Sequence, residues 1–419
     1  MERIGVMGGT FNPIHLSHIM VAARAYDMLN LDKILFMPSK QPTYKNMDCI
    51  ASEQDRCAMI ERAIKPYPFF ELSDFELRRE GPTYSADTFR LLKKESPDTK
   101  YYFIIGGDSL DYFENWHEPQ VILQNCTLVV APRATELKEK KGADEFAECD
   151  YAATADRIRR KFTLTNEDGS VFTPEILFLS SPLVSISSSD LRNYLECDIS
   201  VNGLLDTKVM EYIREKGLYE NKVFLKIKED MKATLKPRRY THVMNVASMC
   251  FKLAKLHGYD PVKAYTAGLL HDCAKHLNDE EILKECDRLG IKYDEVERRQ
   301  ASNLLHSKVG AVWAKEKYGI ADEDIISAIS FHTTGRPDMS TLEKILYMSD
   351  VIEPGRDMDY KPSLEVIRSI ATYDLDLACA HVLNNVVPYI LSNYKDNVCM
   401  LTVETYEYYK KFLETHDCK

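Results

Sequence analysis

The feature that most constrains the fold is a change of secondary-structure pattern near residue 220. Before it, short β-type runs alternate with amphipathic, helix-type stretches. The predicted strands are Arg3–Met7, Lys33–Met37, Tyr101–Ile105, Thr127–Ala131 and Glu175–Leu179, and helical patterns such as Ile19–Leu29 and Glu53–Ile64 lie between them. This alternation predicts a doubly wound parallel α/β sheet, in which ligands bind beyond the carboxyl ends of the strands.

After this change, segments with a 3.6-residue period replace the strands. They are Val243–Leu256, Pro261–Ala274, Glu280–Leu289, Lys308–Tyr318, Asp322–Ser330, Leu342–Val351 and Leu375–Ser392. We therefore predict two domains, an α/β domain at residues 1–221 and an all-α domain at residues 222–419.

Composition narrows the possible functions. The chain has 419 residues, of which 45% are hydrophobic and 28% charged, with a formal net charge of −11. It lacks the basic stripe that nucleic-acid binding needs and any apolar run near the roughly 18 residues of a membrane span, so neither partner is expected. The 11 cysteines include no Cys-x-x-Cys pair, and the first residues resemble a strand more than a signal peptide. We therefore expect reduced thiols and a cytoplasmic protein.

The segment after the first predicted strand carries the first candidate site. Gly8 and Gly9 allow a phosphate to approach the backbone at a helix start, where unpaired N–H groups attract anions. His15 and His18 are spaced i, i+3, so both lie on one face of that helix. Two imidazoles there suit the charge that develops on a triphosphate in a transition state. Two glycines alone would indicate only a tight turn, whereas the histidine spacing favours a functional site.

A second signal lies downstream, at the start of another predicted helix. The run from Ser185 to Ser189 contains four serines and precedes Arg192. One serine commonly caps a helix, but four exceed what one cap requires. Arg192, one turn into the helix, adds a cation suited to a β- or γ-phosphate.

These two segments resemble the HxGH-type nucleotidyltransferase superfamily, and within it the bacterial nicotinate mononucleotide adenylyltransferases. The resemblance covers residues 1–220 and includes the segments Gly81–Thr88 and Gly106–Leu110 and residue Trp116. The chain departs from the family pattern at Ser17, where glycine is usual, and at Ser189, where threonine is commoner. Both residues are small, so activity is expected to survive. The preference for nicotinate or nicotinamide stays open.

The resemblance implies that the phosphate of nicotinate mononucleotide displaces pyrophosphate from ATP, which brings Mg²⁺ with it. The catalytic residues that hold the phosphates would be His15, His18 and Arg192. The ATP site would comprise Gly8, Gly9, Thr10, Phe11, Asp108, Ser187 and Ser188. The nicotinate mononucleotide site would comprise Thr83, Tyr84, Trp116, Lys40 and Arg133.

Two other readings of this half stay open. Pantetheine-phosphate adenylyltransferases share similar end motifs, but they are usually shorter and are not expected to pair Gly106–Leu110 with Trp116. A nucleotide-binding α/β domain without catalytic activity is the other.

The helical half contains a second candidate site. The pair His271-Asp272 ends an apolar stretch, where a charged aspartate is unfavourable unless it is paired or bound to metal. A single histidine is more often a core or surface residue than a ligand. Here, however, several such residues occur in a fixed order: His242, His271-Asp272, His306, His332 and Asp350. Nitrogen and oxygen donors of this kind suit Fe, Mn or Zn.

That order resembles the HD phosphohydrolase superfamily. Over residues 225–419 the chain is most similar to a small bacterial branch that splits diadenosine tetraphosphate symmetrically into two ADP. The resemblance implies a pair of iron ions, or of manganese or other divalent ions, bound by His242, His271, Asp272 and Asp350, with Asp272 also catalytic. The residues that contact the hydrolase substrate would be His306, His332, Lys275 and Arg356.

The residues leave the substrate of this half open. Hydrolysis of another nucleotide, or a regulatory module that binds a nucleotide without cleaving it, would use similar features. Retention of every ligand type argues against a module that has lost catalysis. The sequence also leaves open whether the chain forms a homo-oligomer.

Overall fold

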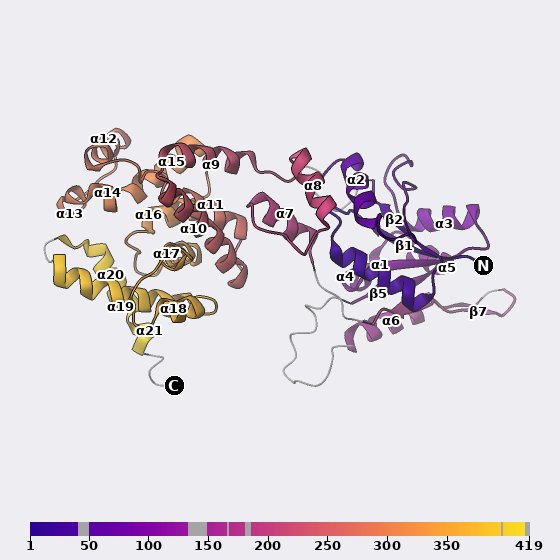
Figure 1. The fold of residues 1–419 in the computed structure, drawn as a ribbon. Helices are drawn as coiled ribbons and strands as arrows, with labels where there is room; N and C mark the ends of the chain where they lie inside the picture. Colours follow the sequence, from indigo (N-terminus) through magenta and orange to yellow (C-terminus); the bar gives the residue numbers. More distant parts are fainter. Residues whose placement is uncertain (41–49, 133–148, 166, 181–185, 395–396, 415–419) are drawn as a thin grey trace. The chain divides into compact units, whose positions relative to one another are not determined.

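The computed structural model describes residues 1–40, 50–132, 149–165, 167–180, 186–394 and 397–414. The chain forms two compact units, Met1–Tyr219 and Glu220–Lys419 (Figure 1). The first unit alternates strands with helices, whereas the described part of the second contains helices alone. The predicted fold class, an α/β sheet domain followed by an all-α domain, is confirmed.

A six-stranded parallel sheet organises the first unit, with the strand order β3-β2-β1-β4-β5-β8. The strands are β1 (Arg3–Gly9), β2 (Lys33–Pro38), β3 (Phe70–Leu72), β4 (Lys100–Gly106), β5 (Cys126–Ala131) and β8 (Ile176–Phe178). The order reverses between β1 and β4. In parallel sheets this reversal is where ligands bind, beyond the carboxyl ends of the strands.

Helices cover both faces of the sheet because successive strand residues point to opposite sides. Met7 and Ile104 belong to one apolar cluster, whereas their neighbours Val6 and Phe103 belong to the other. The first cluster contains residues of α1 (Leu16–Leu29), α2 (Glu53–Ile64), α7 (Ser188–Glu196) and α8 (Thr207–Lys216). The second contains residues of α3 (Ser85–Glu95), α4 (Gly107–Tyr112), α5 (Pro119–Asn125) and α6 (Cys149–Phe162).

The sequence pattern missed the short strands of this unit. β3 is a three-residue edge strand, paired with β2 alone. β6 (Leu164–Thr165) and β7 (Val171–Phe172) form a separate antiparallel pair of two residues each. Runs this short carry too little periodicity to be recognised.

The second unit is built from helices of very different lengths. They are α9 (Lys222–Thr234), α10 (Pro237–Leu256), α11 (Pro261–Leu270), α12 (Asp279–Leu289), α13 (Glu295–Arg299), α14 (Ala301–Leu304), α15 (His306–Tyr318), α16 (Glu323–Phe331), α17 (Thr341–Ile352), α18 (Leu364–Ile370), α19 (Leu375–Tyr394), α20 (Met400–Tyr409) and α21 (Lys411–Glu414). Four of them form a contacting group, in which α11 and α17 contact each other and both contact α10 and α16. Each of these four provides a residue of the site described below.

Helix α11 ends earlier than the apolar pattern predicts. The prediction extends to Ala274, but the helix stops at Leu270, and turns follow in which the Cys273 N–H donates to the Leu270 carbonyl at 3.1 Å. His271 is therefore the C-cap residue of α11. This position directs His271 and Asp272 into the unit instead of along the helix.

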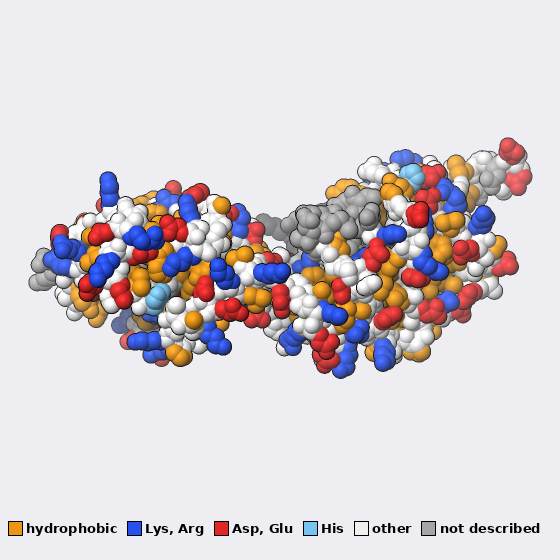
Figure 2. Space-filling view, turned by 90° about the horizontal axis from the view of Figure 1, so that it is seen from above, with side chains coloured by type: hydrophobic (Ala, Val, Ile, Leu, Met, Phe, Trp, Pro, Cys, Tyr) orange, Lys and Arg blue, Asp and Glu red, His pale blue; other side chains and the backbone are white. Residues whose placement is uncertain are grey.

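On the face shown in Figure 2, Lys and Arg side chains are interspersed with Asp and Glu. None of the described helices combines the length and the apolar character that a bilayer crossing requires.

Close packing of α10 on α11 should make Gly268 hard to replace. A Cβ atom at Gly268 would lie 2.7 Å from the Ala247 Cα atom, which is backbone and cannot rotate away. We expect Gly268→Ala to lower the stability of the helical unit by about 1–3 kcal/mol, the usual cost of overpacking. Calorimetric unfolding of the full chain measures this effect.

Gly310→Ala is the matched control, because its nearest neighbour would be a side-chain atom, Cys273 Sγ, at 3.2 Å. The smaller loss is expected there. Equal losses in the two variants would contradict the packing argument.

Candidate functional sites

The loop between β1 and α1 forms the first candidate site, at the carboxyl edge of the sheet. His15 is the N-cap residue of α1, and its backbone N–H donates to His18 Nδ1 at 3.2 Å. The two imidazole rings stack with their centroids 3.7 Å apart, and the Phe11 ring meets the His18 ring edge-on at 5.0 Å. Both imidazoles therefore lie where the helix N-terminus attracts anions.

The serine–arginine segment reaches this same loop from about 180 residues away in the sequence. Arg192 Nη1 donates to the Asn12 carbonyl at 2.8 Å, and Ser188 Oγ donates to the Pro13 carbonyl at 3.1 Å. Ser187 is the N-cap of α7 and accepts from the backbone N–H groups of Ser189 and Asp190. One serine thus caps the helix, while its neighbour ties the two segments together.

Two buried residues that the sequence analysis did not select support this loop. Arg56, only 1% exposed, donates from Nη1 to the Thr10 carbonyl at 2.9 Å. Asn12, 3% exposed, accepts at Oδ1 from the Ala51 N–H at 3.0 Å and from the Tyr219 hydroxyl at 2.7 Å. A signal for Arg56 existed in the sequence, because it lies on the same face of α2 as Met59 and Ile60.

The other predicted residues of this unit lie around the same edge. Thr83 and Tyr84 precede α3, and the Tyr84 ring lies 4.3 Å from that of His117 between centroids. Trp116 packs its ring against Phe113 and Phe103, with centroids 5.4 and 6.1 Å apart. The sequence analysis did not select His117, which lies beside Trp116 and contacts Tyr84.

The remaining predicted positions follow three strand ends. Gly8 and Gly9 end β1, and Asp108 is in the first turn of α4, directly after β4. Lys40 follows β2 and donates from Nζ to the Arg79 carbonyl. Arg133 lies outside the described residues.

A cluster of histidines and aspartates, all buried except the partly exposed Asp350, forms the second candidate site, within the helical unit. His242 lies on α10, His271 caps α11, Asp272 follows it, and His332 caps α16. His306 begins α15 and Asp350 lies on α17. The ligand atoms of His242, His271 and Asp350 all lie within 4.8 Å of one another, as do those of His271, Asp272 and His332.

Hydrogen bonds fix the direction of three of these imidazoles. His271 Nδ1 lies 2.7 Å from the Gly268 carbonyl oxygen, and His332 Nδ1 lies 2.7 Å from that of Ile329. His242 Nδ1 lies 3.2 Å from Glu353 Oε1. A carbonyl or a carboxylate can only accept, so each Nδ1 carries a proton, and Nε2 is the ring atom left for a metal ligand.

The cluster is held together by charge. Asp272 is 2% exposed, and its oxygens lie 3.4 Å from His271 Nε2, 3.3 Å from His306 Nε2 and 2.8 Å from Arg239 Nη1. Burial alone raises the pKa of Asp272, but His271 and His306 outweigh it and hold that pKa well below its usual range. Burial lowers the pKa of His332 to about 3, so its imidazole is neutral.

The donor set fits a divalent metal ion. Nε2 of His242 and Nε2 of His271 are buried and make no hydrogen bond of good geometry among the described residues, although each has a carboxylate oxygen within 3.4 Å. Asp350 Oδ1 lies 3.0 Å from His242 Nε2, so an oxygen and a nitrogen donor already adjoin. Neutral imidazoles and carboxylates are the ligands that Fe, Mn and Zn accept.

The sequence analysis missed the residues behind these donors. Glu353, 3% exposed, accepts from the Asn245 side chain at 2.8 Å and from the Gly355 N–H at 2.6 Å, besides its contact with His242. Burial raises the pKa of Glu353, but these hydrogen bonds hold it below its usual range. A signal was present, because Asn245 follows His242 and Glu353 follows Asp350 by one helical turn each.

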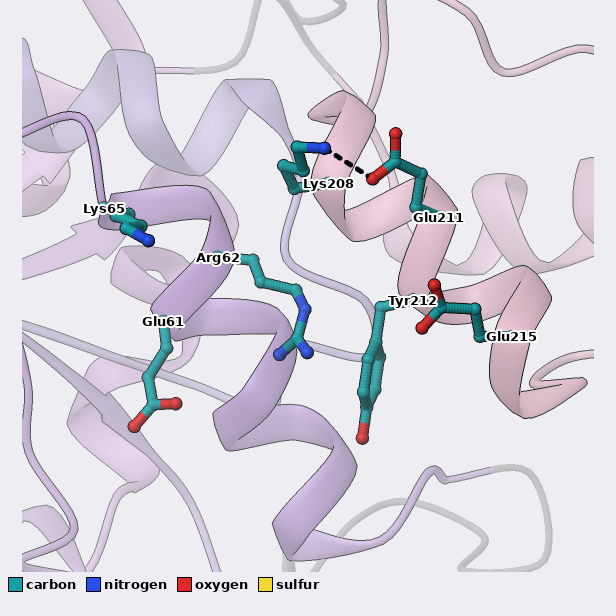
Figure 3. Close-up of a pocket in the computed structure, with 7 residues that line it drawn as sticks. All are labelled: Glu61, Arg62, Lys65, Lys208, Glu211, Tyr212 and Glu215. Atoms are coloured by element: carbon teal, nitrogen blue, oxygen red, sulfur yellow. Dashed lines mark hydrogen bonds and ion pairs between the residues drawn. The ribbon is translucent and has the colours of Figure 1, made fainter.

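A groove between α2 and α8 is a third feature of the first unit (Figure 3). It is lined by Glu61, Arg62, Lys65, Lys208, Glu211, Tyr212 and Glu215. Arg62 lies over the Tyr212 ring, with Cζ 4.1 Å from its centroid, and Lys208 pairs with Glu211 at 2.8 Å. Its lining contains both acidic and basic groups, so this groove favours no ligand of one charge.

Each half of the chain matches a known protein family. The cytidylyltransferase-like family model matches residues 6–194, and the HD domain model matches residues 239–355. A protein of Lachnoclostridium phytofermentans named "Probable nicotinate-nucleotide adenylyltransferase" is 38% identical over 219 residues, which is 52% of this chain and all of that protein.

One further relative is similar over both halves of the chain. A Mycoplasma genitalium protein named "Probable nicotinate-nucleotide adenylyltransferase/Ap4A hydrolase" is 26% identical over 396 residues, or 94% of this chain and 99% of that one. The crystal structure of a Clostridium acetobutylicum protein described as a "predicted HD superfamily hydrolase involved in NAD metabolism" is 37% identical. It covers 45% of this chain and 97% of that one, with a TM-score of 0.42.

The strand–loop–helix site and the relatives thus agree for the first unit, and the histidine–aspartate cluster and the family model agree for the second. The chain belongs to the nicotinate-nucleotide adenylyltransferase family and carries an HD domain behind its adenylyltransferase half.

Proposed function

We propose that the first unit transfers AMP from ATP to nicotinate mononucleotide, giving deamido-NAD and pyrophosphate. A phosphate oxygen of the mononucleotide forms a bond to the α-phosphorus of ATP, and the bond from that phosphorus to the β-phosphate oxygen breaks. No protein nucleophile is needed, so positioning and charge stabilisation supply the catalysis.

The observation that carries this proposal is the convergence of Arg192 and Ser188 on the loop that leads to His15 and His18. In this arrangement His15, His18 and Arg192 hold the phosphates at the start of α1. Mg²⁺ bound to the ATP adds charge neutralisation there. The residues assigned to ATP are Gly8, Gly9, Thr10, Phe11, Asp108, Ser187 and Ser188.

Nicotinate mononucleotide is assigned to the neighbouring strand ends. Tyr84 and Trp116 offer aromatic faces for the pyridine ring. Thr83 and Lys40 offer a hydroxyl and a cation beside them. The contact between Tyr84 and His117 supports this assignment, because it joins the segment before α3 to the segment around Trp116.

For the second unit we propose symmetrical hydrolysis of diadenosine tetraphosphate to two ADP. Water adds to one of the two central phosphorus atoms, and the bridge between these atoms breaks. His242, His271, Asp272 and Asp350 would hold an iron or manganese pair, which supplies water activation and charge neutralisation when bound. The carrying observation is the set of Nε2 atoms turned toward shared carboxylates.

Substrate contacts are assigned to groups beside these donors. Lys275 Nζ lies 3.3 Å from His306 Nδ1. Because an ammonium group can only donate, His306 Nδ1 must be the acceptor of this hydrogen bond. His306 therefore carries its proton on Nε2, which points at Asp272 Oδ1 and at His332 Nε2, 3.2 Å away. Arg356 Nη2 lies 2.9 Å from Asp350 Oδ1. Its guanidinium group is therefore close enough to this aspartate to neutralise a phosphate bound beside it.

Separate substitutions should separate the two activities. We expect His18→Ala to lower the rate of deamido-NAD formation at least 100-fold, as loss of one group that stabilises developing charge does in other enzymes. Asp272→Asn should leave that rate unchanged and abolish the hydrolase reaction. Pyrophosphate release and ADP formation measure the two reactions, and loss of both in either variant would contradict the assignment.

The hydrolase products test the substrate proposal. With diadenosine tetraphosphate and Fe²⁺ or Mn²⁺, the full chain should give ADP alone, resolved by ion-exchange chromatography. AMP plus ATP would contradict the symmetrical cut. Binding without any product would indicate a regulatory module.

Glu353 should control metal affinity. Glutamine at this position has only one accepting oxygen for the three donors that Glu353 serves, and it removes the negative charge beside His242. We expect Glu353→Gln to weaken Mn²⁺ binding about 10- to 100-fold, measured by calorimetric titration. Asn245→Ala, which removes only the outer hydrogen bond, should weaken binding less. Equal affinity for metal in Glu353→Gln and the unchanged protein would rule out this role.

A further inference from the structure

We propose that Tyr219 is a positioning residue for adenylyl transfer. Its hydroxyl fixes the side chain of Asn12 in the phosphate-binding loop, which is the segment 10–15 between β1 and α1. The proposal rests on the function proposed for the first unit. Tyr219 is the last residue of that unit, 204 to 207 positions beyond the loop that it contacts.

Asn12 connects Tyr219 to the catalytic groups through its two oxygens. Oδ1 accepts from the Tyr219 hydroxyl at 2.7 Å and from the Ala51 N–H at 3.0 Å. Its main-chain oxygen accepts from Arg192 Nη1 at 2.8 Å. A shift of Asn12 therefore moves the acceptor of Arg192, and His15 lies three residues further along the same loop.

The surroundings keep the Tyr219 hydroxyl a donor. Burial raises the pKa of Tyr219, although the nearby Arg192 and Arg56 lower it. The phenol thus keeps its proton at neutral pH, and its hydroxyl donates a hydrogen bond to Asn12 Oδ1. Asn12 is only 3% exposed, so water has little access to replace this bond.

The backbone at Tyr219 indicates that this side chain is held in place. Its φ is +63°, in the left-handed region that is uncommon for a tyrosine. Gly217, two residues earlier, has φ +60° and ends α8. Two left-handed residues bring the chain back toward the loop after the helix, and the Tyr219 hydroxyl ends on Asn12.

Tyr212 provides a matched control on the same terminal segment. Its hydroxyl donates at 2.8 Å to Asp55 Oδ1 on α2, and it lines the groove of Figure 3, outside the loop. Tyr212→Phe and Tyr219→Phe therefore each remove one hydroxyl from one tyrosine–acceptor pair. Only the second pair includes a residue of the phosphate-binding loop.

The test measures steady-state adenylyl transfer by the full chain with ATP and nicotinate mononucleotide, together with the melting temperature. For Tyr219→Phe we expect kcat to fall about 3- to 10-fold, the range that loss of one ordinary hydrogen bond produces. The KM for nicotinate mononucleotide should stay unchanged, since its assigned residues follow other strands. Tyr212→Phe should keep the original kcat.

Several results would overturn the proposal. They are an equal loss of kcat in both variants, a lower melting temperature of Tyr219→Phe with unchanged kinetics, and a Tyr219→Phe protein that fails to fold. The last two would assign the tyrosine to the scaffold alone. Failure of the proposed function is distinguishable, because the unsubstituted chain would then form no deamido-NAD.

Discussion

The carboxylate of Asp272 is the constraint on which the helical unit depends. An ionised carboxyl group with 2% exposure is tolerated only where opposite charge and hydrogen bonds surround it. His271, His306 and Arg239 meet that requirement from three separate segments. The close approach of α10 and α11 at Gly268 brings the helix of Arg239 against the helix that ends at His271, so packing and part of the site chemistry depend on the same contact.

In the α/β unit, the corresponding constraint is that the buried polar groups of the loop after β1 must be hydrogen-bonded. The carbonyl groups of the loop after β1 need hydrogen-bond donors that come from other segments of the chain. Arg56 and Arg192 supply them, from helices 46 and 180 residues away in the sequence. Each arginine thus satisfies a backbone carbonyl of the loop, and Arg192 does so through one nitrogen of its guanidinium group.

Long, periodic segments and ligand-type residues were predictable from the sequence, whereas supporting contacts were not. Strands such as Lys33–Met37 and the helix Glu53–Ile64 were found almost residue for residue. The bond from Tyr219 to Asn12 spans 207 positions, and no local pattern encodes such a distance. Glu353 follows Asp350 by one helical turn, but the predicted helix ends at Val351, where a glutamate normally faces solvent, and only the fold shows that it is buried.

The three oriented imidazoles differ in one respect that bears on how the site could change over time. Those of His271 and His332 are held by main-chain oxygens, which no substitution can replace. That of His242 is held by a side chain, Glu353. Of these three hydrogen-bond partners, only Glu353 can therefore be changed by mutation. A substitution there, in evolution or by design, would alter metal selectivity without replacing a metal ligand.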